Sequence, residues 1–381
     1  MNKIKKLLYG LLTLIMLLPA LSQGKAFAAP DNSAGAAILI HGDTGQVLYE
    51  KNADERMLIA STTKIMTALV VIENCDPNGT VTVLPEHAAV EGSSMYLKAG
   101  GEYTVSNLLY GLMLASGNDA ASALAYHCGG SDEGFAEMMN EKAEALGLLN
   151  TSFKNPHGLD AQGHYSSAAD LAVITAKALE NELFAQIVST KTHTIGEQTY
   201  MNHNKLLWRY EGAIGVKTGY TMAAGRSLVS GAERNGLRLV CVTLSDPNDW
   251  SDHTALYDWG FENFEYNRTM PTDRLIELPL ISGEKSSVGI ACRCDSRLLV
   301  EKNKELSLSL ELPEFVYAGV KEGECAGRAF VMADGETIGE FPLIYDEDAP
   351  LSKTVKLSPW ERFQRGWFLV NKYSLVFKGS D

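Results

Sequence analysis

The hydrophobic pattern of this chain changes once, near Arg274, and that change limits the folds open to it. Between residues 29 and 262, apolar stretches with helical spacing alternate with short β-prone runs. After Arg274 only short alternating runs follow, as far as Asp348. Helices repeat every 3.6 residues and strands every two, so the two regions must fold differently. We predict an α+β domain over residues 29–262 and a small all-β domain over residues 274–348.

The first 28 residues form a three-part pattern ahead of both domains. A short basic segment, Met1–Lys6, leads into an almost continuously apolar run, Leu7–Leu21. Ala26 and Ala28 then supply the small residues that a signal peptidase reads. The apolar run is shorter than the ~20 residues that a membrane-spanning helix needs. We expect a secretory signal peptide, so that the mature protein works outside the cytoplasm.

Charge and cysteine content exclude several classes of function. The formal net charge is −14, which argues against a nucleic-acid partner, because phosphate binding needs a basic surface. No His-rich or Cys-rich cluster predicts a metal, and we expect no cofactor. Cys241 lies in an apolar run and suits a core position. Export permits disulfides, but the pairing of the six cysteines cannot be derived from the sequence.

The C-terminal tail carries the opposite charge. Residues 353–381 contain six basic residues against two acidic ones, a balance of +4. Over residues 358–381 the pattern predicts an amphipathic helix with aromatic residues on one face: Trp360, Phe363 and Trp367. One interpretation is a terminal helix docked on the protein itself. The basic excess favours the other, a peripheral anchor on a membrane surface.

Several elements of the first domain can be placed from the pattern. Two β-prone runs flank the turn at residues 41–45 and predict a hairpin, and a second hairpin is predicted through Asn235-Gly236. Five helices are expected: Met57–Asn74, Asn107–Ala115, Asp119–His127, Asp132–Leu146 and Ser167–Leu179. Three later strands are expected: Gly212–Tyr220, Ser227–Glu233 and Leu237–Leu244.

Three short elements carry chemistry only when taken together. They are Ser61-Thr62-Thr63-Lys64, Ser116-Gly117-Asn118 and Lys217-Thr218-Gly219. A Ser-x-x-Lys occurs by chance about once or twice in a chain of this length. A second match, Ser282–Lys285, lies in a polar stretch of the β-rich region without a helix or partners, and we interpret it as a surface loop.

The first element suits nucleophilic catalysis. Residues three apart on a helix share a face, so Ser61 Oγ and the Lys64 amine can meet. A serine hydroxyl needs a base, and a lysine becomes one only when burial or a neighbouring cation lowers its pKa. Apolar neighbours on both sides favour such burial. The free N–H groups at a helix start also suit an oxyanion site at Ser61.

The other two elements suit substrate binding. Ser116 and Asn118 fall at a break between two helices, where a hydroxyl and an amide can face a cleft; a helix-capping loop is the plainer explanation for either alone. Lys217 and Thr218 lie on a strand with little side-chain bulk. Gly219 marks a place where another backbone approaches. An extended peptide with an anionic end could add along that edge.

In their order, and with separations of 55 and 101 residues, these motifs resemble the active-site serine penicillin-recognising enzymes. The chain is most similar to the low-molecular-mass D-alanyl-D-alanine carboxypeptidases, which carry Ser-Gly-Asn as the middle element. The stretch Asn155–Asp160 also resembles this family, and the resemblance extends over essentially the whole chain. It implies an antiparallel sheet with a helical cluster, a small β-rich domain and a C-terminal membrane anchor.

The resemblance also implies a role for each site residue. Ser61 would attack the carbonyl between two terminal D-alanines of a peptidoglycan stem peptide, with Lys64 as general base and Ser116 passing the proton to the departing D-alanine. Asn118 would bind the acyl side of the substrate. Lys217 and Thr218 would hold the terminal carboxylate, and Gly219 would belong to the same substrate-binding strand. The N–H groups of Ser61 and Tyr220 would form the oxyanion hole, and β-lactams would acylate Ser61.

Three other functions stay open at this point. A D,D-endopeptidase that cuts cross-links would use the same motifs. A catalytically silent protein that binds stem peptides would not need an intact Ser61 and Lys64. A β-lactamase is disfavoured by the extra β-rich domain and tail.

Overall fold

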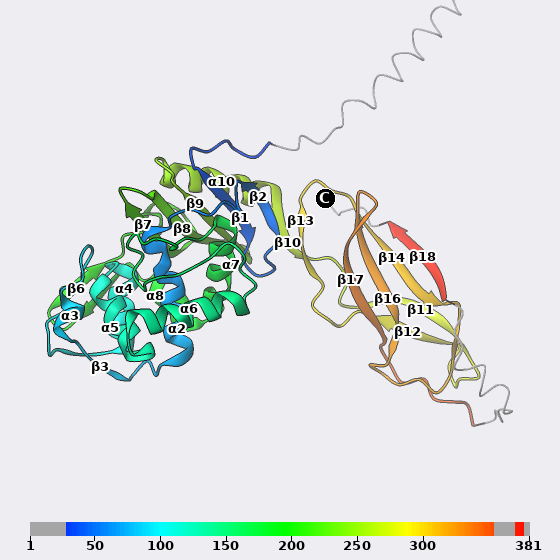
Figure 1. Ribbon diagram of the computed structural model, residues 1–381. Coiled ribbons are helices and arrows are strands. Elements are labelled where there is room, and N and C mark those ends of the chain that lie inside the picture. Colours follow the sequence, from blue (N-terminus) through cyan, green and yellow to red (C-terminus); the bar gives the residue numbers. More distant parts are fainter. Residues whose placement is uncertain (1–27, 354–369, 377–381) are drawn as a thin grey trace, which may run out of the picture. The chain divides into compact units, whose positions relative to one another are not determined.

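The computed structural model describes residues 28–353 and 370–376, which form two compact units (Figure 1). The boundary between the units in the sequence lies directly before Asn263. The second unit begins earlier than the Arg274 expected from the sequence. Its first strand, β10 (Phe264–Arg268), pairs antiparallel with β13 (Arg297–Glu301) inside the same unit. Neither five-residue strand carries an alternation long enough to be recognised in the sequence.

The first unit is built on a five-stranded antiparallel sheet in the order β2-β1-β9-β8-β7. Its strands are β1 (Ala36–His41), β2 (Val47–Lys51), β7 (Ala213–Thr221), β8 (Gly225–Arg234) and β9 (Leu237–Leu244). Both predicted hairpins are confirmed. Asn235 and Gly236 turn the chain with φ values of 51° and 77°, which this pair of residues adopts readily. β7 lies at an edge of this sheet, and among the described strands it pairs with β8 alone.

Helices cover both faces of this sheet. On β1, Ile38 and Ile40 join the core shared with the main helical cluster, whereas Leu39 points the other way and packs near Gly260 of α10. The longer helices are α2 (Lys64–Asn74), α4 (Val105–Leu114), α5 (Asn118–Gly129), α6 (Asp132–Ala145), α7 (Ala168–Leu179), α8 (Glu182–Ser189) and α10 (Asp249–Asn263). Short elements complete the unit: α3 (Pro85–Ala88), α9 (Leu206–Arg209), β3 (Thr80–Thr82), β4 (Glu102–Thr104), β5 (Thr192–Ile195) and β6 (Gln198–Met201).

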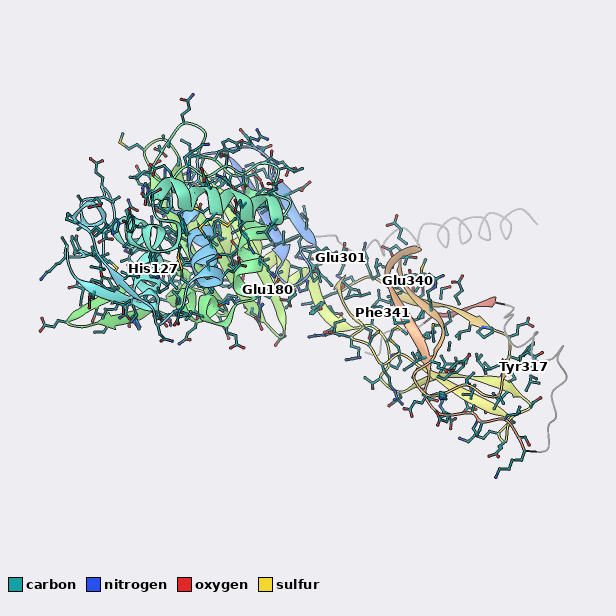
Figure 2. The ribbon with its side chains drawn as sticks, turned by 60° about the horizontal axis from the view of Figure 1, so that its bottom comes forward. His127, Glu180, Glu301, Tyr317, Glu340 and Phe341 are labelled. Atoms are coloured by element: carbon teal, nitrogen blue, oxygen red, sulfur yellow. A yellow bond between two sulfur atoms is a disulfide. The ribbon has the colours of Figure 1, made fainter. Side chains whose placement is uncertain are left out.

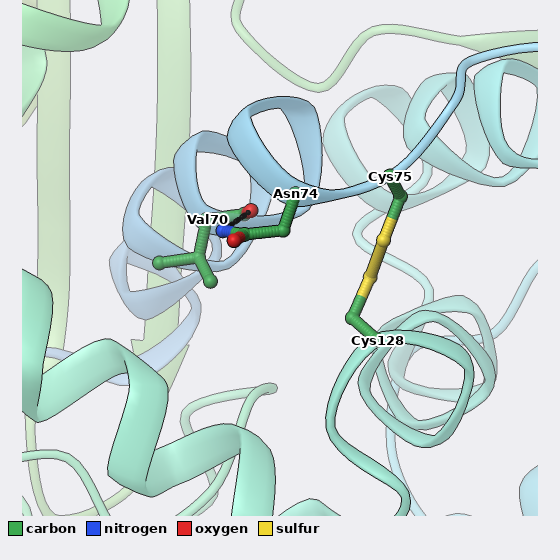
Figure 3. The surroundings of a disulfide bond; sticks show 4 residues. All are labelled: Val70, Asn74, Cys75 and Cys128. Carbon is green, nitrogen blue, oxygen red and sulfur yellow. Dashed lines mark hydrogen bonds between the residues drawn. A yellow bond between two sulfur atoms is a disulfide. The ribbon is translucent and has the colours of Figure 1, made fainter.

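A disulfide joins two of these helices (Figure 3). Cys75 caps the C-terminus of α2, and Cys128 lies near the end of α5. Asn74, the residue directly before the cap, donates from Nδ2 to the carbonyl of Val70, one turn earlier, at 2.8 Å. Cys241 is fully buried on β9, as expected of a core residue.

The second unit is all-β, as the sequence predicts. Its main sheet has seven strands in the order β15-β11-β12-β17-β16-β14-β18. They are β11 (Arg274–Ile281), β12 (Ser287–Ala291), β14 (Leu306–Pro313), β15 (Val316–Tyr317), β16 (Cys325–Ala333), β17 (Glu336–Tyr345) and β18 (Val370–Val376). On β17 the exposed Glu340 and the buried Phe341 point to opposite faces (Figure 2). This alternation is the one that identified the strand in the sequence.

The predicted C-terminal helix is wrong where it can be compared. Residues 354–369 and 377–381 lie outside the described part of the chain, but Val370–Val376 forms β18 and pairs antiparallel with β14. The physical reason is the edge of β14, whose backbone groups would otherwise lack strand partners on that side. Pairing with this edge overrides the helical spacing of the tail residues. Among the helices that the structure describes, none combines the length and apolar character needed to cross a membrane.

Candidate active site

Ser61 lies in a single 3-10 turn, η2 (Ala60–Thr63), which runs directly into α2. The predicted helix therefore begins at Ala60 and with a tighter turn than expected. Two threonine hydroxyls fix this turn: Thr62 Oγ1 donates to the Ile59 carbonyl at 2.6 Å, and Thr63 Oγ1 donates to the Ala60 carbonyl at 2.8 Å. Ala60 has a φ of 47°, a costly backbone conformation for alanine, immediately before Ser61.

The Lys64 amine lies 3.0 Å from Ser61 Oγ and has two further partners. It donates to Asn118 Oδ1 at 2.7 Å and to the His157 carbonyl at 2.6 Å. A neutral amine has two N–H donors and one lone pair. Because these two oxygens can only accept, they take both donors, and the lone pair is left for the proton of Ser61. The contacts of Lys64 therefore fit a general base.

The surroundings of Lys64 also favour the neutral amine. The side chain is completely buried, and this burial lowers its pKa well below the usual value. The nearby Lys217 ammonium lowers the pKa further, while the carboxylate of Asp119 acts in the opposite direction. The sequence predicted partial burial; the structure makes it complete.

The second motif places Ser116 between α4 and α5, and Asn118 at the first position of α5. Ser116 is buried and has a φ of 62°, a second strained residue at the site. The Asn118 side chain donates to the Glu91 carbonyl, and its backbone N–H donates to the Ser93 carbonyl at 2.7 Å. Asn118 therefore connects Lys64 to the loop that contains Ser93, one of the residues lining the cleft.

The third motif lies on the edge strand β7. Lys217 is 1% exposed, and burial lowers its pKa to about 7. Its amine donates to the Thr218 carbonyl at 2.7 Å. A side chain at Gly219 would place its first carbon 3.0 Å from the Ile59 carbonyl oxygen and 3.2 Å from the Ser61 nitrogen. The glycine thus lets β7 lie directly against the turn that carries Ser61, as the sequence predicted for a close backbone approach.

One cleft brings the three motifs together. Ser61, Ser116, Thr218, Gly219 and Tyr220 all line it. Lys64, Asn118 and Lys217 are buried and do not line it; Lys64 joins the site through its contacts with Ser61 and Asn118. Among residues 28–353, no group of three or more His, Cys, Asp or Glu side chains is placed to hold a metal ion.

Sequence reasoning missed several residues of this site. Asp119 accepts from Ser94 Oγ at 2.6 Å and from the backbone N–H of Leu97 at 3.0 Å, which fixes the neighbouring loop. His157 contributes its carbonyl rather than its ring, and burial lowers the pKa of that ring to about 3. His157 lies in Asn155–Asp160, the stretch that resembles the family, and Asp119 directly follows the second motif, but neither signal predicted these contacts.

A third missed residue is Arg226 on β8, opposite Tyr220 of β7. Its guanidinium donates to both carboxylate oxygens of Asp249, at 2.9 and 2.8 Å, and Asp249 is almost completely buried. Both residues line the cleft together with Trp250. No local pattern links two residues 23 positions apart on a strand and a helix.

The site combines a half-buried serine with a buried amine, and both lie beside a cleft at the edge strand of the sheet. This arrangement defines a serine hydrolase that works through an acyl-enzyme. Residues 23–248 match the family model described as D-alanyl-D-alanine carboxypeptidase, and residues 264–350 match that of the penicillin-binding protein 5 C-terminal domain. The chain belongs to the D-alanyl-D-alanine carboxypeptidase family.

Named relatives cover most of the chain. It is 34% identical to D-alanyl-D-alanine carboxypeptidase DacF of Bacillus subtilis over 90% of this chain and 94% of that protein. It is 35% identical to DacC of Escherichia coli over 84% of this chain and 85% of that protein. The crystal structure of penicillin-binding protein 5 from Haemophilus influenzae matches with a TM-score of 0.71 and 31% identity, over 85% of this chain and all of that one.

Proposed function

We propose that this protein is a serine D,D-carboxypeptidase that removes the terminal D-alanine from peptidoglycan stem peptides. The observation that carries the proposal is the Lys64 amine, whose two N–H donors have carbonyl partners and whose third direction faces Ser61 Oγ at 3.0 Å. Family membership supplies the substrate class. The first unit contains every residue that the reaction requires.

In the proposed reaction Ser61 Oγ attacks the carbonyl between the two terminal D-alanines, and Lys64 takes the hydroxyl proton. The N–H groups of Ser61 and Tyr220 stabilise the oxyanion. The C–N bond then breaks, and Ser116 passes a proton to the departing amine. Water hydrolyses the acyl-enzyme, restores the serine and releases the shortened peptide. Penicillins and other β-lactams acylate Ser61 by the same attack.

Binding of the substrate is assigned to the edge strand and the helix break. Lys217 and Thr218 hold the terminal carboxylate, and Gly219 lets the strand approach Ser61. Asn118 binds the acyl side. Arg226 lines the same cleft and adds a second cation near the carboxylate. The buried Lys217, together with Lys205 and Arg226 on the lining of the cleft, favours a substrate that ends in a free carboxylate.

D-alanine release from diacetyl-Lys-D-Ala-D-Ala tests this proposal, with the parent and Ser61→Ala proteins measured side by side. We expect release and covalent penicillin labelling by the parent only. Labelling of Ser61 without release would show that the substrate is wrong. A folded parent protein that shows neither would support the silent binding protein instead.

We further propose that the protein is exported, loses residues 1–28, and is held at the outer face of the cytoplasmic membrane by its tail. The aromatic and basic composition of residues 358–369 supports this. Ending the chain at Leu357 would also remove β18, so substitution of Trp360 and Trp367 by serine is the sharper test. Release of that variant from the membrane fraction is expected; retention would show another attachment.

A further inference from the structure

The second unit contains two thiols that the proposed reaction does not use. Cys292 directly follows β12, a strand of the seven-stranded sheet, and Cys294 lies in the loop that leads to β13, which pairs with β10. Their sulfur atoms are 3.2 Å apart. An S–S bond is about 2.0 Å long, so small rotations of the two side chains would bring the sulfur atoms within bonding distance. We call these two cysteines the thiol pair.

The two sulfur atoms of the thiol pair differ in their access to solvent. Cys292 is 1% exposed and belongs to the apolar core of the second unit, whereas Cys294 is only partly buried. Burial raises the pKa of the Cys292 thiol to about 11, and the contact with Cys294 adds to this rise. A reagent from solvent therefore meets Cys294 first, and Cys292 lies behind it as a protonated thiol.

The loop that carries the thiol pair is held by contacts that do not involve sulfur. Arg268 Nη1 donates to the Cys294 carbonyl at 3.3 Å. Arg293, between the two cysteines, pairs with Glu322 at 2.6 Å and donates to the Asp346 carbonyl at 3.3 Å. The sulfur atoms are therefore placed together before any bond forms. Such proximity strongly accelerates a reaction between two groups, which offsets the small thiolate fraction of Cys292.

A bond within the thiol pair would contribute little to the stability of the fold. It would close a loop from residue 292 to residue 294, whereas the Cys75–Cys128 bond joins residues 53 positions apart. The entropy that a disulfide removes from the unfolded chain grows with the length of this loop. By linkage, folding protects a disulfide from reduction only as much as the disulfide stabilises the fold. Once oxidised, the thiol pair should therefore be reduced far more readily than the Cys75–Cys128 bond.

We propose that Cys292 and Cys294 form a reversible redox pair that exchanges with small-molecule disulfides. The Cys294 thiolate attacks one sulfur of the incoming disulfide, and the other half leaves as a thiolate. Cys292 then gives its proton to water and attacks the Cys294 sulfur, which expels the second half. The thiol pair loses two electrons and two protons, and the disulfide that is cleaved gains them. Neither step uses Ser61 or Lys64, so this inference is independent of the proposed function.

Trypsin gives a direct measurement, because Arg293 places a cleavage site between the two cysteines. Purified protein is equilibrated with mixtures of reduced and oxidised glutathione, alkylated, and digested without reduction. A closed pair keeps residues 286–293 and 294–297 in one species, which is lighter than the two peptides together by the hydrogens that the thiols have lost. An open pair gives two separate alkylated peptides. We expect the thiol pair to open at a ratio of reduced to oxidised glutathione at least about tenfold lower than the ratio that opens Cys75–Cys128.

Two results of this titration would overturn the inference. A thiol pair that stays open in the folded protein at every ratio would show that the two sulfur atoms cannot bond. A closed pair that resists reduction as strongly as Cys75–Cys128 would be a structural disulfide instead of a reversible one.

Single substitutions separate a pair from one reactive thiol. Cys292→Ser should no longer give the linked species and should accumulate the glutathione adduct on Cys294, because the second step is blocked. Cys294→Ser should give neither product, since Cys292 is buried. Cys325→Ser is the matched control: it removes the exposed cysteine of β16 and should leave the midpoint of the thiol pair within twofold of the parent. A linked species that persists in Cys294→Ser, or is lost in Cys325→Ser, would contradict the assignment.

Discussion

The two units differ in where their charged side chains lie. In the first, Lys64, Asp119 and Lys217 are at most 1% exposed. In the second, the ion pairs around Arg274 and Arg328 lie at the surface, and the core holds apolar side chains. Burying a charged group is costly unless the surroundings compensate it. The contrast therefore identifies the first unit as the one that carries destabilising buried charges, and these charges belong to its catalytic site.

Backbone strain follows the same division. Ala60 and Ser116 adopt positive φ values of 47° and 62° directly at the cleft. In the second unit the positive φ values of Ser282, 65°, and Asp334, 50°, both lie in turns, where that conformation is ordinary. Residues strained without a turn to explain them concentrate at functional sites. Three matched pairs of substitutions and one pH dependence test this difference between the units.

The largest contrast is between the two Ser-x-x-Lys sequences. Lys64→Met should lower acylation by penicillin and D-alanine release by about a thousandfold, because removing the base leaves Ser61 as an ordinary hydroxyl. Lys285→Met removes an exposed lysine that pairs with Glu347 and should leave both rates within twofold. Stopped-flow acylation measures the difference. Comparable losses in both variants would contradict the assignment of the base.

Two glycines with the same φ of +86° give the second contrast. At Gly158 a side chain would collide with the Ala60 carbonyl and approach Thr63 Oγ1, whereas nothing lies within 4 Å of one at Gly335. Gly158→Ala should therefore cost about 2–4 kcal/mol of unfolding free energy, from overpacking plus the positive φ. Gly335→Ala should cost about 1 kcal/mol, from the φ alone.

Urea unfolding of each variant measures these costs, with limited proteolysis assigning each transition to its unit. Gly158→Ala should also slow acylation, since Ala60 directly precedes Ser61. Equal costs for the two glycines would show that the first unit can relax around Ala60.

The third contrast concerns pH. Lys217 must be charged to hold a carboxylate, and burial lowers its pKa to about 7 in the free enzyme. We therefore expect kcat/KM to fall about tenfold for each pH unit above that value. The fall in kcat should come at higher pH, because a bound carboxylate favours the ammonium. Lys217→Arg should remove this decline, and an unchanged profile in that variant would assign it to another group.

Stability should change in the opposite direction. The pKa of Lys217 is lower in the folded than in the unfolded chain, so the unfolded chain binds more protons between about pH 7 and the ordinary lysine pKa. The first unit should therefore become more stable as the pH rises through this window, while it becomes less active. Urea midpoints from pH 7 to 9.5 test this, with Lys217→Met as the control in which the slope is smaller, because the buried Lys64 still contributes in the same direction.

The smallest contrast is between two arginine–carboxylate pairs. Arg226→Ala should raise KM for D-Ala-D-Ala peptides several-fold and destabilise the first unit, because it leaves the buried Asp249 without its partner. Arg274→Ala breaks a pair in the second unit with a similarly exposed arginine, 38% against 44% for Arg226, but a more exposed carboxylate, 10% for Asp346 against 3% for Asp249. Surface pairs contribute about 0–1 kcal/mol, so little change in unfolding is expected there. A KM unaffected by Arg226→Ala would remove that residue from the carboxylate site.

The sequence revealed most of the first unit because its signals are local. Helical spacing placed α4 to α7, and Asn235-Gly236 placed a hairpin. The three motifs were recognised together although each alone is weak. The hydroxyl-rich turn before α2 was missed, because bonds from Thr62 and Thr63 back to nearby carbonyls leave no hydrophobic pattern.

Contacts distant in sequence could not be derived in this way. The pairing of Arg226 with Asp249, and the His157 carbonyl at Lys64, depend on how separate elements pack. The strand at Val370–Val376 was mistaken for helix because its conformation is set by a partner, β14, about sixty residues earlier. The residue pattern within one segment cannot show that a distant strand, here β14, has an unpaired edge with which the segment can pair.

The disulfide between Cys75 and Cys128 has a consequence for when the site can assemble. It links residues 53 positions apart and so lowers the entropy of the unfolded chain, a contribution of about 4 kcal/mol to stability for a loop of that size. The two helices that it ties carry Lys64 and Asn118 at their first positions. Disulfides persist only in oxidising surroundings. Under the export proposed above, a copy that folded in a reducing cytoplasm would lack this tether, and the site would reach its full rigidity only after export.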